Sequence, residues 1–205
     1  FYETEDINFA FTVHTQDGVV APVLRNAHEK DLETVAQEMR VLARKARRTD
    51  PHELYERCAN AFVGTAIRQL DYRALPMGWV WLRSKLFPRH KPEKVWPEIP
   101  EEDKLQPKDI ITATCSVANV GMMLPGIQGV TLVIQPETMF IGIGDLHLGP
   151  VVRDGEIVPR YLISMNFTID HRAFDGGAAF PLHAHLRRYF AHPELIYEWK
   201  EGDEI

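Results

Sequence analysis

A strictly alternating stretch near the C-terminal end constrains the fold of this chain more than any other feature. Between residues 161 and 170 every second side chain is apolar, and those between them are mostly polar. The apolar positions are Tyr161, Ile163, Met165, Phe167 and Ile169. A period of two is that of a half-buried β-strand. The pattern therefore predicts a strand that runs directly into His171.

A helix is expected shortly after this strand. Asp175-Gly176-Gly177 breaks the alternation, and apolar residues then recur at helical spacing. They are Ala178, Ala179, Leu182, Leu186 and Phe190. Asp175 is expected to cap this helix, because its carboxylate can accept hydrogen bonds from the free N–H groups of the first turn. An imidazole mounted in this way can act as a general base near neutral pH, although a lone histidine at a strand end is more often structural.

The segment DHRAFDGG, residues 170–177, resembles the His-x-x-x-Asp-Gly signature of the acyltransferase (E2) catalytic domains of 2-oxoacid dehydrogenase complexes. Three longer segments are also similar to that family: DINFAFTVHTQDGVVAPVLRNA at 6–27, SVANVGMMLPGIQG at 116–129 and VVRDGEIVPRYLISMNFTIDHR at 151–172. The resemblance implies the chloramphenicol acetyltransferase-like fold. This is an α/β fold, a two-layer α+β sandwich in which helices pack on a mixed sheet.

The same resemblance implies acyl transfer between coenzyme A and a thiol such as dihydrolipoamide. His171 would be the general base that deprotonates the thiol, and Asp175 would fix the loop that holds it. Ser116 and Asn119 would contact the substrate, and no metal takes part. The lipoyl group would come from a partner protein or another domain. Family active sites form between subunits, so a homotrimer is expected, with a larger cage as an alternative.

The sequence departs from the family at Ala118. In the motif that SVANVG resembles, this position carries the hydroxyl that stabilises the tetrahedral oxyanion. Ser116 lies on the same strand face, about 6.5 Å away along an extended chain. Losing one oxyanion donor slows such reactions by about 10²- to 10³-fold. Two alternatives therefore stay open: a weak or inactive E2-like scaffold subunit, and an O-acyltransferase of small molecules.

Length and composition fit one domain over residues 1–205, because 205 residues with 45% hydrophobic content can bury one core. The chain enters a strand almost at once, so the family's N-terminal part is expected to be missing from it. Residues 71–109 hold six prolines and three tryptophans. We expect an ordered insertion without long regular elements there. Its tryptophans would pack on this subunit or a neighbour, and contact with a membrane surface through residues 76–91 is the alternative.

Other elements follow from local patterns. A helix is expected over EKDLETVAQEMRVLARKAR, residues 29–47, and the basic end at Arg44, Lys45, Arg47 and Arg48 would complement the helix dipole. A second helix should start at Asp50-Pro51, with Glu53 reaching back to its first turn. Its buried stripe would be Leu54, Cys58, Ala59, Phe62 and Ala66. Hairpins are expected around Asp17-Gly18 and Asp154-Gly155, and strands at 130–135 and 138–144.

Charge and side-chain chemistry exclude several other functions. The net charge of −6 leaves no electrostatic footprint for nucleic acid. Cys58 and Cys115 form no C-x-x-C pattern, which indicates neither a disulfide framework nor a zinc site. His183 and His185 are two residues apart on the expected helix and would not chelate a metal together. No secretory signal and no membrane-spanning run is recognisable, so we expect a cytoplasmic protein, or a mitochondrial matrix protein in a eukaryote.

Overall fold

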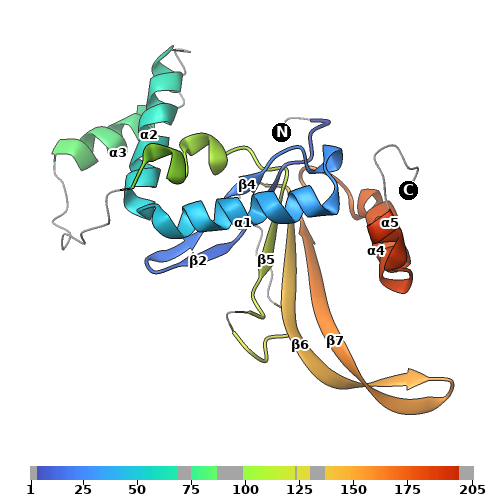
Figure 1. The fold of residues 1–205 in the computed structure, drawn as a ribbon. Helices are drawn as coiled ribbons and strands as arrows, with labels where there is room; N and C mark the ends of the chain where they lie inside the picture. Colours follow the sequence, from blue (N-terminus) through green and yellow to red (C-terminus); the bar gives the residue numbers. More distant parts are fainter. Residues whose placement is uncertain (1–3, 69–74, 87–98, 123, 130–136, 199–205) are drawn as a thin grey trace.

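A five-stranded mixed sheet organises the protein. The computed structural model describes residues 4–68, 75–86, 99–122, 124–129 and 137–198, with strand order β4-β1-β5-β6-β7 (Figure 1). The strands are β1 Phe9–Phe11, β4 Val23–Leu24, β5 Cys115–Asn119, β6 Met139–Arg153 and β7 Glu156–Ile169. β5 runs parallel to both β1 and β6, whereas β4 and β7 are antiparallel to their neighbours. The expectation of a mixed sheet is confirmed.

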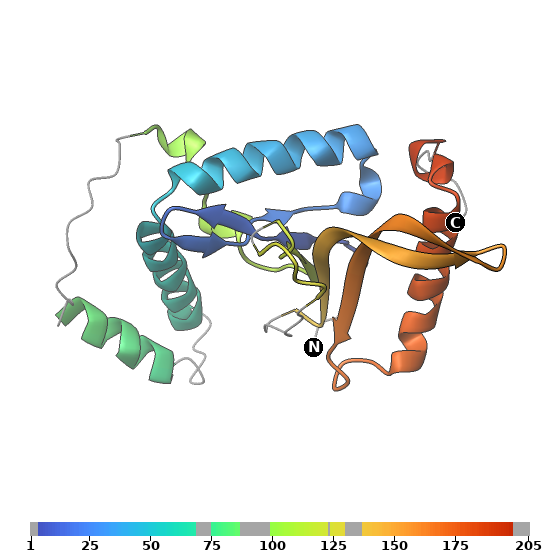
Figure 2. The same ribbon diagram turned by 90° about the horizontal axis from the view of Figure 1, so that it is seen from below.

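Helices flank this sheet at its two ends. The described helices are α1 Leu32–Arg48, α2 Pro51–Arg68, α3 Leu75–Leu86, α4 Phe180–Ala191 and α5 Glu194–Glu198. Short 3₁₀ turns are η1 Ala27–Glu29, η3 Glu101–Asp103, η4 Pro107–Asp109 and η5 Gly176–Ala179. α1 lies across the end that holds β4 and β1, and α4 lies beside β7 at the opposite end (Figure 2).

The main core lies between α1, the start of α2 and the N-terminal strands. Its buried members are Phe11, Val13, Val20, Ala46, Leu54 and Leu105. α1 begins at Leu32 and not at Glu29, because the Asp31 carboxylate caps it by accepting a 2.7 Å hydrogen bond from the backbone N–H of Thr34. Thr49, at the end of α1, is buried, and its hydroxyl accepts a 2.8 Å hydrogen bond from the N–H of Leu105. This bond fixes the chain that returns from the insertion onto the core.

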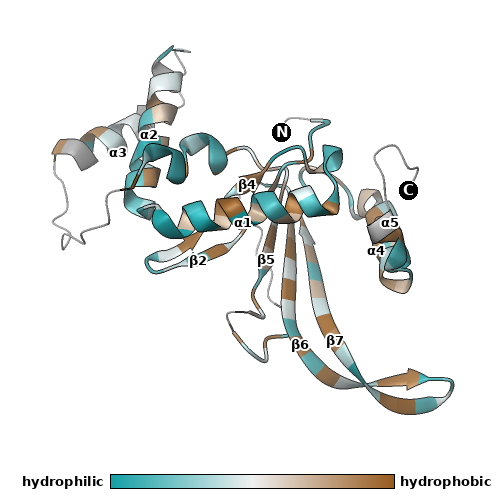
Figure 3. Ribbon diagram, viewed as in Figure 1, coloured by the Kyte–Doolittle hydropathy of each residue, from teal (hydrophilic) through white to brown (hydrophobic). Residues whose placement is uncertain are grey.

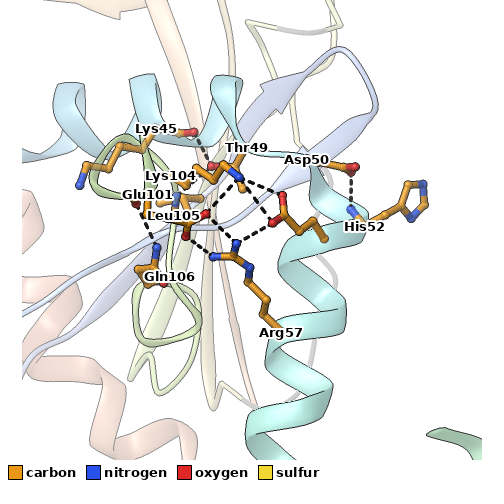
Figure 4. Close-up of polar contacts among 10 residues, drawn as sticks. Lys45, Thr49, Asp50, His52, Arg57, Glu101, Lys104, Leu105 and Gln106 are labelled. Carbon is orange, nitrogen blue, oxygen red and sulfur yellow. Dashed lines mark hydrogen bonds and ion pairs between the residues drawn. The ribbon is translucent and has the colours of Figure 1, made fainter. Parts of the chain in front are cut away.

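α2 differs from its prediction in two ways. Asp50 caps the helix through the N–H of His52, at 2.8 Å, but Glu53 does not reach back to the first turn. Instead its carboxylate pairs with Arg57 at 2.6 Å and Lys104 at 3.3 Å, and both cations also pair with Glu101 (Figure 4). The predicted stripe is buried only at the start of the helix: Leu54 is buried and Cys58 half-buried, whereas Ala59 and Phe62 are exposed. α2 extends away from the body, so its outer half has no core to face.

The expectation that residues 71–109 lack long regular elements is wrong, because α3 has 12 residues. Pro76 is its second residue, and a proline in the first turn costs no helical hydrogen bond. Trp81 of α3 donates a 2.6 Å hydrogen bond to Asn60 of α2, while Trp79 is exposed. The third tryptophan, Trp96, lies outside the described residues. Among the helices described, none has the length and apolar character needed to cross a membrane.

Both predicted hairpins are present. β2 Val13–Thr15 and β3 Gly18–Val20 form a separate two-stranded sheet. β6 and β7 pair from Met139 and Ile169 to Arg153 and Glu156. Their two-residue turn has positive φ at Asp154 (53°) and Gly155 (84°), as a type I′ turn requires. β6 is one strand of 15 residues, so it joins the strand predicted at 138–144 to the hairpin. The strand predicted at 130–135 lies outside the described residues.

The hairpin of β6 and β7 extends beyond the rest of the sheet (Figure 1), and hydrophobic residues recur along it (Figure 3). Many of its apolar side chains are exposed in the part of the chain that the structure describes. The most exposed of them are Leu146, Leu148, Val152, Ile157, Tyr161 and Ile163. The strand predicted from the alternation in residues 161–170 is confirmed. The prediction that its apolar face is buried is wrong for the single chain. Tyr161 is 75% exposed, whereas Asp170 on the other face is 9% exposed. We call residues 146–163 the hairpin arm.

Candidate active site

His171 lies where the sequence predicts, immediately beyond the end of β7. The N–H of Asp170 donates to the carbonyl of Thr138 at 2.8 Å and so attaches the end of the strand to the start of β6. The side chain of His171 is exposed. Gly176 lies beside its ring, since a Cβ placed on that glycine would be 3.6 Å from Cε1 of His171. The imidazole is therefore held at a strand exit and is open on the outside.

Asp175 precedes a helical segment, but the predicted side-chain cap is wrong. The segment opens with the 3₁₀ turn η5, and α4 follows from Phe180. The backbone carbonyl of Asp175 accepts the N–H of Ala178 at 3.0 Å, and its carboxylate makes no capping hydrogen bond. Because the first turn is a 3₁₀ turn, the N–H of Ala178 is already bound to the backbone carbonyl of Asp175. It is therefore not free to bind the carboxylate.

Sequence reasoning missed the ion pair that flanks His171. Oδ1 of Asp170 accepts from Nε of Arg172 at 2.9 Å, and Oδ2 accepts from Nη2 at 2.6 Å. The hydrogen bonds from the Arg172 guanidinium and backbone lower the pKa of Asp170 to about 2. The signal was present in the sequence, because opposite charges two residues apart enclose the histidine in DHR.

Ser116 and Ala118 share one face of β5, as predicted, and both are buried. Ser116 pairs with Ala10 on one side and Phe140 on the other. Asn119 faces the opposite side and is exposed, and its Oδ1 accepts the N–H of Met122 at 3.2 Å. The structure therefore does not bring Ser116 and Asn119 together. They are three residues apart on β5, and strand positions separated by an odd number of residues point to opposite faces.

Asn119 lines a groove of about 620 Å³ between α1 and the strands. Its cationic residues are Arg40, Arg44 and Arg47 from α1, and its apolar ones include Phe11, Val13, Met39 and Met122. Spacings of four and three residues place the three arginines on one side of a helix. The helix-end role expected of Arg44 and Arg47 applies to the last turn, which includes only Arg47 of these two, and does not explain why Arg40 and Arg44 share this groove. Guanidinium groups beside an apolar floor suit a ligand that carries both phosphate and an apolar chain.

Strand register separates this groove from His171 within one chain. Ala118 is level with Gly142 on β6, which is level with Asn166 on β7. Two strand spacings amount to about 10 Å, and the four residues from Asn166 to Asp170 add about 13 Å along the strand. One small acyl group cannot contact His171 and Ala118 of the same chain.

The described residues do not form a metal site, and their two cysteine thiols are poorly suited to act as nucleophiles. They contain no group of three His, Cys, Asp or Glu side chains placed to hold a metal ion. His183 lies on α4 at a mostly apolar cavity of about 320 Å³. Burial raises the pKa of the Cys58 thiol, and burial together with Glu137 raises that of Cys115, which makes both poorer nucleophiles.

Residues 1–55 and 98–198 match the family model of the 2-oxoacid dehydrogenases acyltransferase (catalytic domain). The chain belongs to this family. The unmatched residues 56–97 include most of α2 and all of α3, so these helices lie outside the match to the family model.

Two curated relatives are acetyltransferase components of pyruvate dehydrogenase complexes. The dihydrolipoyllysine-residue acetyltransferase component of Bacillus subtilis is 26% identical over 190 residues, which are 92% of this chain and 30% of the relative. That of Staphylococcus epidermidis is 35% identical over 96 residues, 46% of this chain and 22% of the relative. The chain thus spans less than a third of the length of either relative.

Solved structures of such enzymes share the fold. The dihydrolipoamide acetyltransferase of Azotobacter vinelandii has a TM-score of 0.60 at 22% identity, over 95% of this chain and 58% of that one. A probable dihydrolipoamide acetyltransferase from Listeria monocytogenes gives 0.59 at 21% identity, over 99% and 61%. The cubic core of a pyruvate dehydrogenase multienzyme complex gives 0.57 at 21%, over 95% and 57%. The chloramphenicol acetyltransferase-like fold expected from the sequence is confirmed.

Proposed function

We propose that this chain transfers acyl groups between coenzyme A and the thiol of a dihydrolipoyl group. The observation that carries the proposal is His171, held at the exit of β7 within DHRAFDGG in a chain of this family. The names of the curated relatives support it, since both are dihydrolipoyllysine-residue acetyltransferase components. The solved Azotobacter enzyme adds support, because its study concerned a serine, a histidine and an asparagine in the catalytic mechanism.

The chemistry needs one base and no metal. The imidazole of His171 takes the proton from the attacking thiol, and the thiolate sulfur adds to the thioester carbonyl. The tetrahedral intermediate then expels the other thiolate, which receives the proton back from the imidazolium. One carbon–sulfur bond forms and one breaks, so no oxidant or reductant is required.

The groove at Asn119 is the proposed site for coenzyme A. Its phosphates would be bound by Arg40, Arg44 and Arg47. One guanidinium group can donate two hydrogen bonds to two oxygens of the same phosphate. Phe11, Val13 and Met122 would contact the less polar arm that carries the thiol. We expect Arg44→Gln to raise the KM for acetyl-CoA about tenfold with little change in kcat. Arg48→Gln is the matched control, because Arg48 lies on the same helix but pairs with Asp103 at 3.3 Å and does not line the groove.

A complete site would require a second copy of the chain, and a homotrimer is the assembly we propose. The strand register keeps His171 away from Ala118 and Asn119 within one chain. The hairpin arm offers an apolar surface for a neighbouring copy. The similar cubic core of the pyruvate dehydrogenase complex makes a larger cage an extension of this proposal. A lipoyl-bearing partner or domain, in the cytoplasm or in a mitochondrial matrix, would supply the acyl carrier.

The direct test is transfer from acetyl-CoA to dihydrolipoamide by the purified protein, followed through release of coenzyme A. His171→Ala should lower the rate by about 10²- to 10⁴-fold. His192→Ala should leave it unchanged, because His192 is an exposed histidine that pairs with Glu194. Equal rates for the wild type and His171→Ala would refute the proposed role. Transfer to a hydroxylated acceptor such as chloramphenicol, with none to dihydrolipoamide, would indicate the small-molecule alternative.

Ala118 supplies a second test, of catalytic strength. It has no hydroxyl for an oxyanion, and Ser116 is buried two residues back on the same face. We propose that transfer is slow for this reason. Ala118→Ser should raise kcat by up to about 10²- to 10³-fold. If both the wild type and Ala118→Ser are silent with every acyl-CoA, the scaffold function replaces the enzymatic one.

A further inference from the structure

The placement of His171 depends on its backbone. Among the described residues, no hydrogen bond is made by its imidazole, and the ring lies beside Gly176, which has no side chain to hold it. The conformation of residues 170–173 therefore fixes the direction of the Cα–Cβ bond that carries the ring.

Asp170 determines that conformation through five of its contacts. Its N–H is bound to the carbonyl of Thr138, and its own carbonyl accepts from Ala173 at 2.8 Å and Phe174 at 3.3 Å. Its carboxylate accepts from the backbone N–H of Arg172 at 3.0 Å and from the guanidinium of the same residue. Asp170 thus holds the chain on both sides of His171.

The pair also sets the charge next to the imidazole. Asp170 is the group whose carboxylate interacts electrostatically with His171, and the Arg172 guanidinium neutralises that carboxylate from its exposed side. An unpaired carboxylate would favour the protonated imidazole, which cannot accept a proton from a thiol. An unpaired guanidinium would have the opposite effect.

We infer that Asp170 and Arg172 are positioning residues that hold His171 in place and keep its surroundings close to neutral in charge. This inference rests on the proposed function of His171. Neither residue needs to touch the substrate, because the pair acts through the backbone and the local field.

The charge part of the inference is tested by the pH dependence of kcat/KM in three variants. Arg172→Gln leaves the carboxylate unpaired, so the acid limb should move to higher pH by about half a unit to one unit. Asp170→Asn leaves the guanidinium unpaired, and the limb should move to lower pH. The double variant should return the limb towards the wild-type position, while kcat stays about 10- to 100-fold low because the ion pair on either side of His171 is lost. The pair Arg48→Gln and Asp103→Asn, which removes a distant ion pair, should shift nothing.

A second measurement does not depend on activity. In Asp170→Ala the N–H of Arg172 loses its acceptor, so its hydrogen exchange should accelerate at least about tenfold. The N–H of Thr34, which is bound to Asp31 in α1, should not change.

These outcomes separate the inference from the proposed function. If the wild type transfers no acyl group, the proposed function is refuted. Hydrogen exchange at the N–H of Arg172 still reports on its hydrogen bond to Asp170. If the wild type is active but both single variants move the acid limb in the same direction, or not at all, the pair is merely structural. Unchanged exchange at Arg172 in Asp170→Ala would also overturn the inference.

Discussion

Apolar side chains are buried in the region around α1 but exposed in the hairpin arm. Around α1, Leu54 and Leu105 are fully buried by residues of the same chain. In the hairpin arm, Leu148 is 62% exposed and Ile157 is 76% exposed. The first region therefore has a complete core within one chain, whereas the second presents an apolar surface of the kind that protein partners cover.

The candidate site does not follow this division. The groove of arginines lies on the self-contained region, and His171 follows the end of β7 that is remote from the hairpin arm. If copies associate through the hairpin arm, the contact would bury its apolar side chains.

The largest effect on stability is expected from truncating the first core. Leu54→Ala should lower the free energy of unfolding by about 2–5 kcal/mol, because it leaves a cavity among fully packed side chains. Leu148→Ala should change it by less than about 0.5 kcal/mol under conditions in which the protein is monomeric. Urea titrations of both variants measure the contrast. A large loss for Leu148→Ala in the monomer would mean that the arm has a core of its own.

The largest effect on assembly is expected from a charge in the hairpin arm. Ile163→Asp should weaken self-association by more than about tenfold and reduce acyl transfer in parallel, because an unpaired carboxylate is costly at a buried interface. Analytical ultracentrifugation gives the association state, and far-UV circular dichroism should show that the fold is retained. Asn60→Asp on α2, outside both regions, is the control. Unchanged association in Ile163→Asp would exclude the arm as the contact.

A smaller effect, on the free energy of unfolding at acidic pH, is expected from the carboxyl groups of Asp170 and Glu101. It does not distinguish the two regions. The pKa of Asp170 is lowered from 3.8 to about 2, chiefly by Arg172, and that of Glu101 from 4.5 to about 2, chiefly by Arg57. A lowered carboxyl pKa contributes stability that is present above the unfolded-state value and is lost as pH falls through the folded-state value. The differences in urea midpoint between wild type and Asp170→Asn or Glu101→Gln should therefore be constant above about pH 5 and shrink towards pH 2. A difference that grows on acidification would contradict the assigned partners.

The smallest effect is expected from the ion pairs at the base of the insertion. Arg57 joins Glu53 to Glu101, but these side chains are partly exposed, and exposed pairs contribute little. Arg57→Ala should lower the Tm by less than about 4 °C. Arg160→Ala on β7, for which the described residues include no ion-pair partner, should have no measurable effect. Differential scanning calorimetry at low and high salt would show the difference for Arg57 disappearing as salt increases.

Several features were predictable because they depend on neighbours in the sequence. The strand before His171 and the hairpin turn at Asp154-Gly155, with its positive φ angles, follow from local geometry alone. α3 was missed because proline was treated as a breaker, although Pro76 occupies the first turn, where it is tolerated. The Asp175 cap failed because a backbone carbonyl took the N–H that the carboxylate was expected to bind.

By itself, the sequence determined most of the described strands and hairpin turns, which fold they form, and which histidine is presented at a strand exit. Those properties depend on the period of side chains and on short-range hydrogen bonds. Only the tertiary structure decided that Asn119 joins Arg40, Arg44 and Arg47 in one groove, that Ser116 does not, and that His171 lies far from all of them. Such relations depend on strand register and on packing between segments distant in the chain, which no local pattern contains.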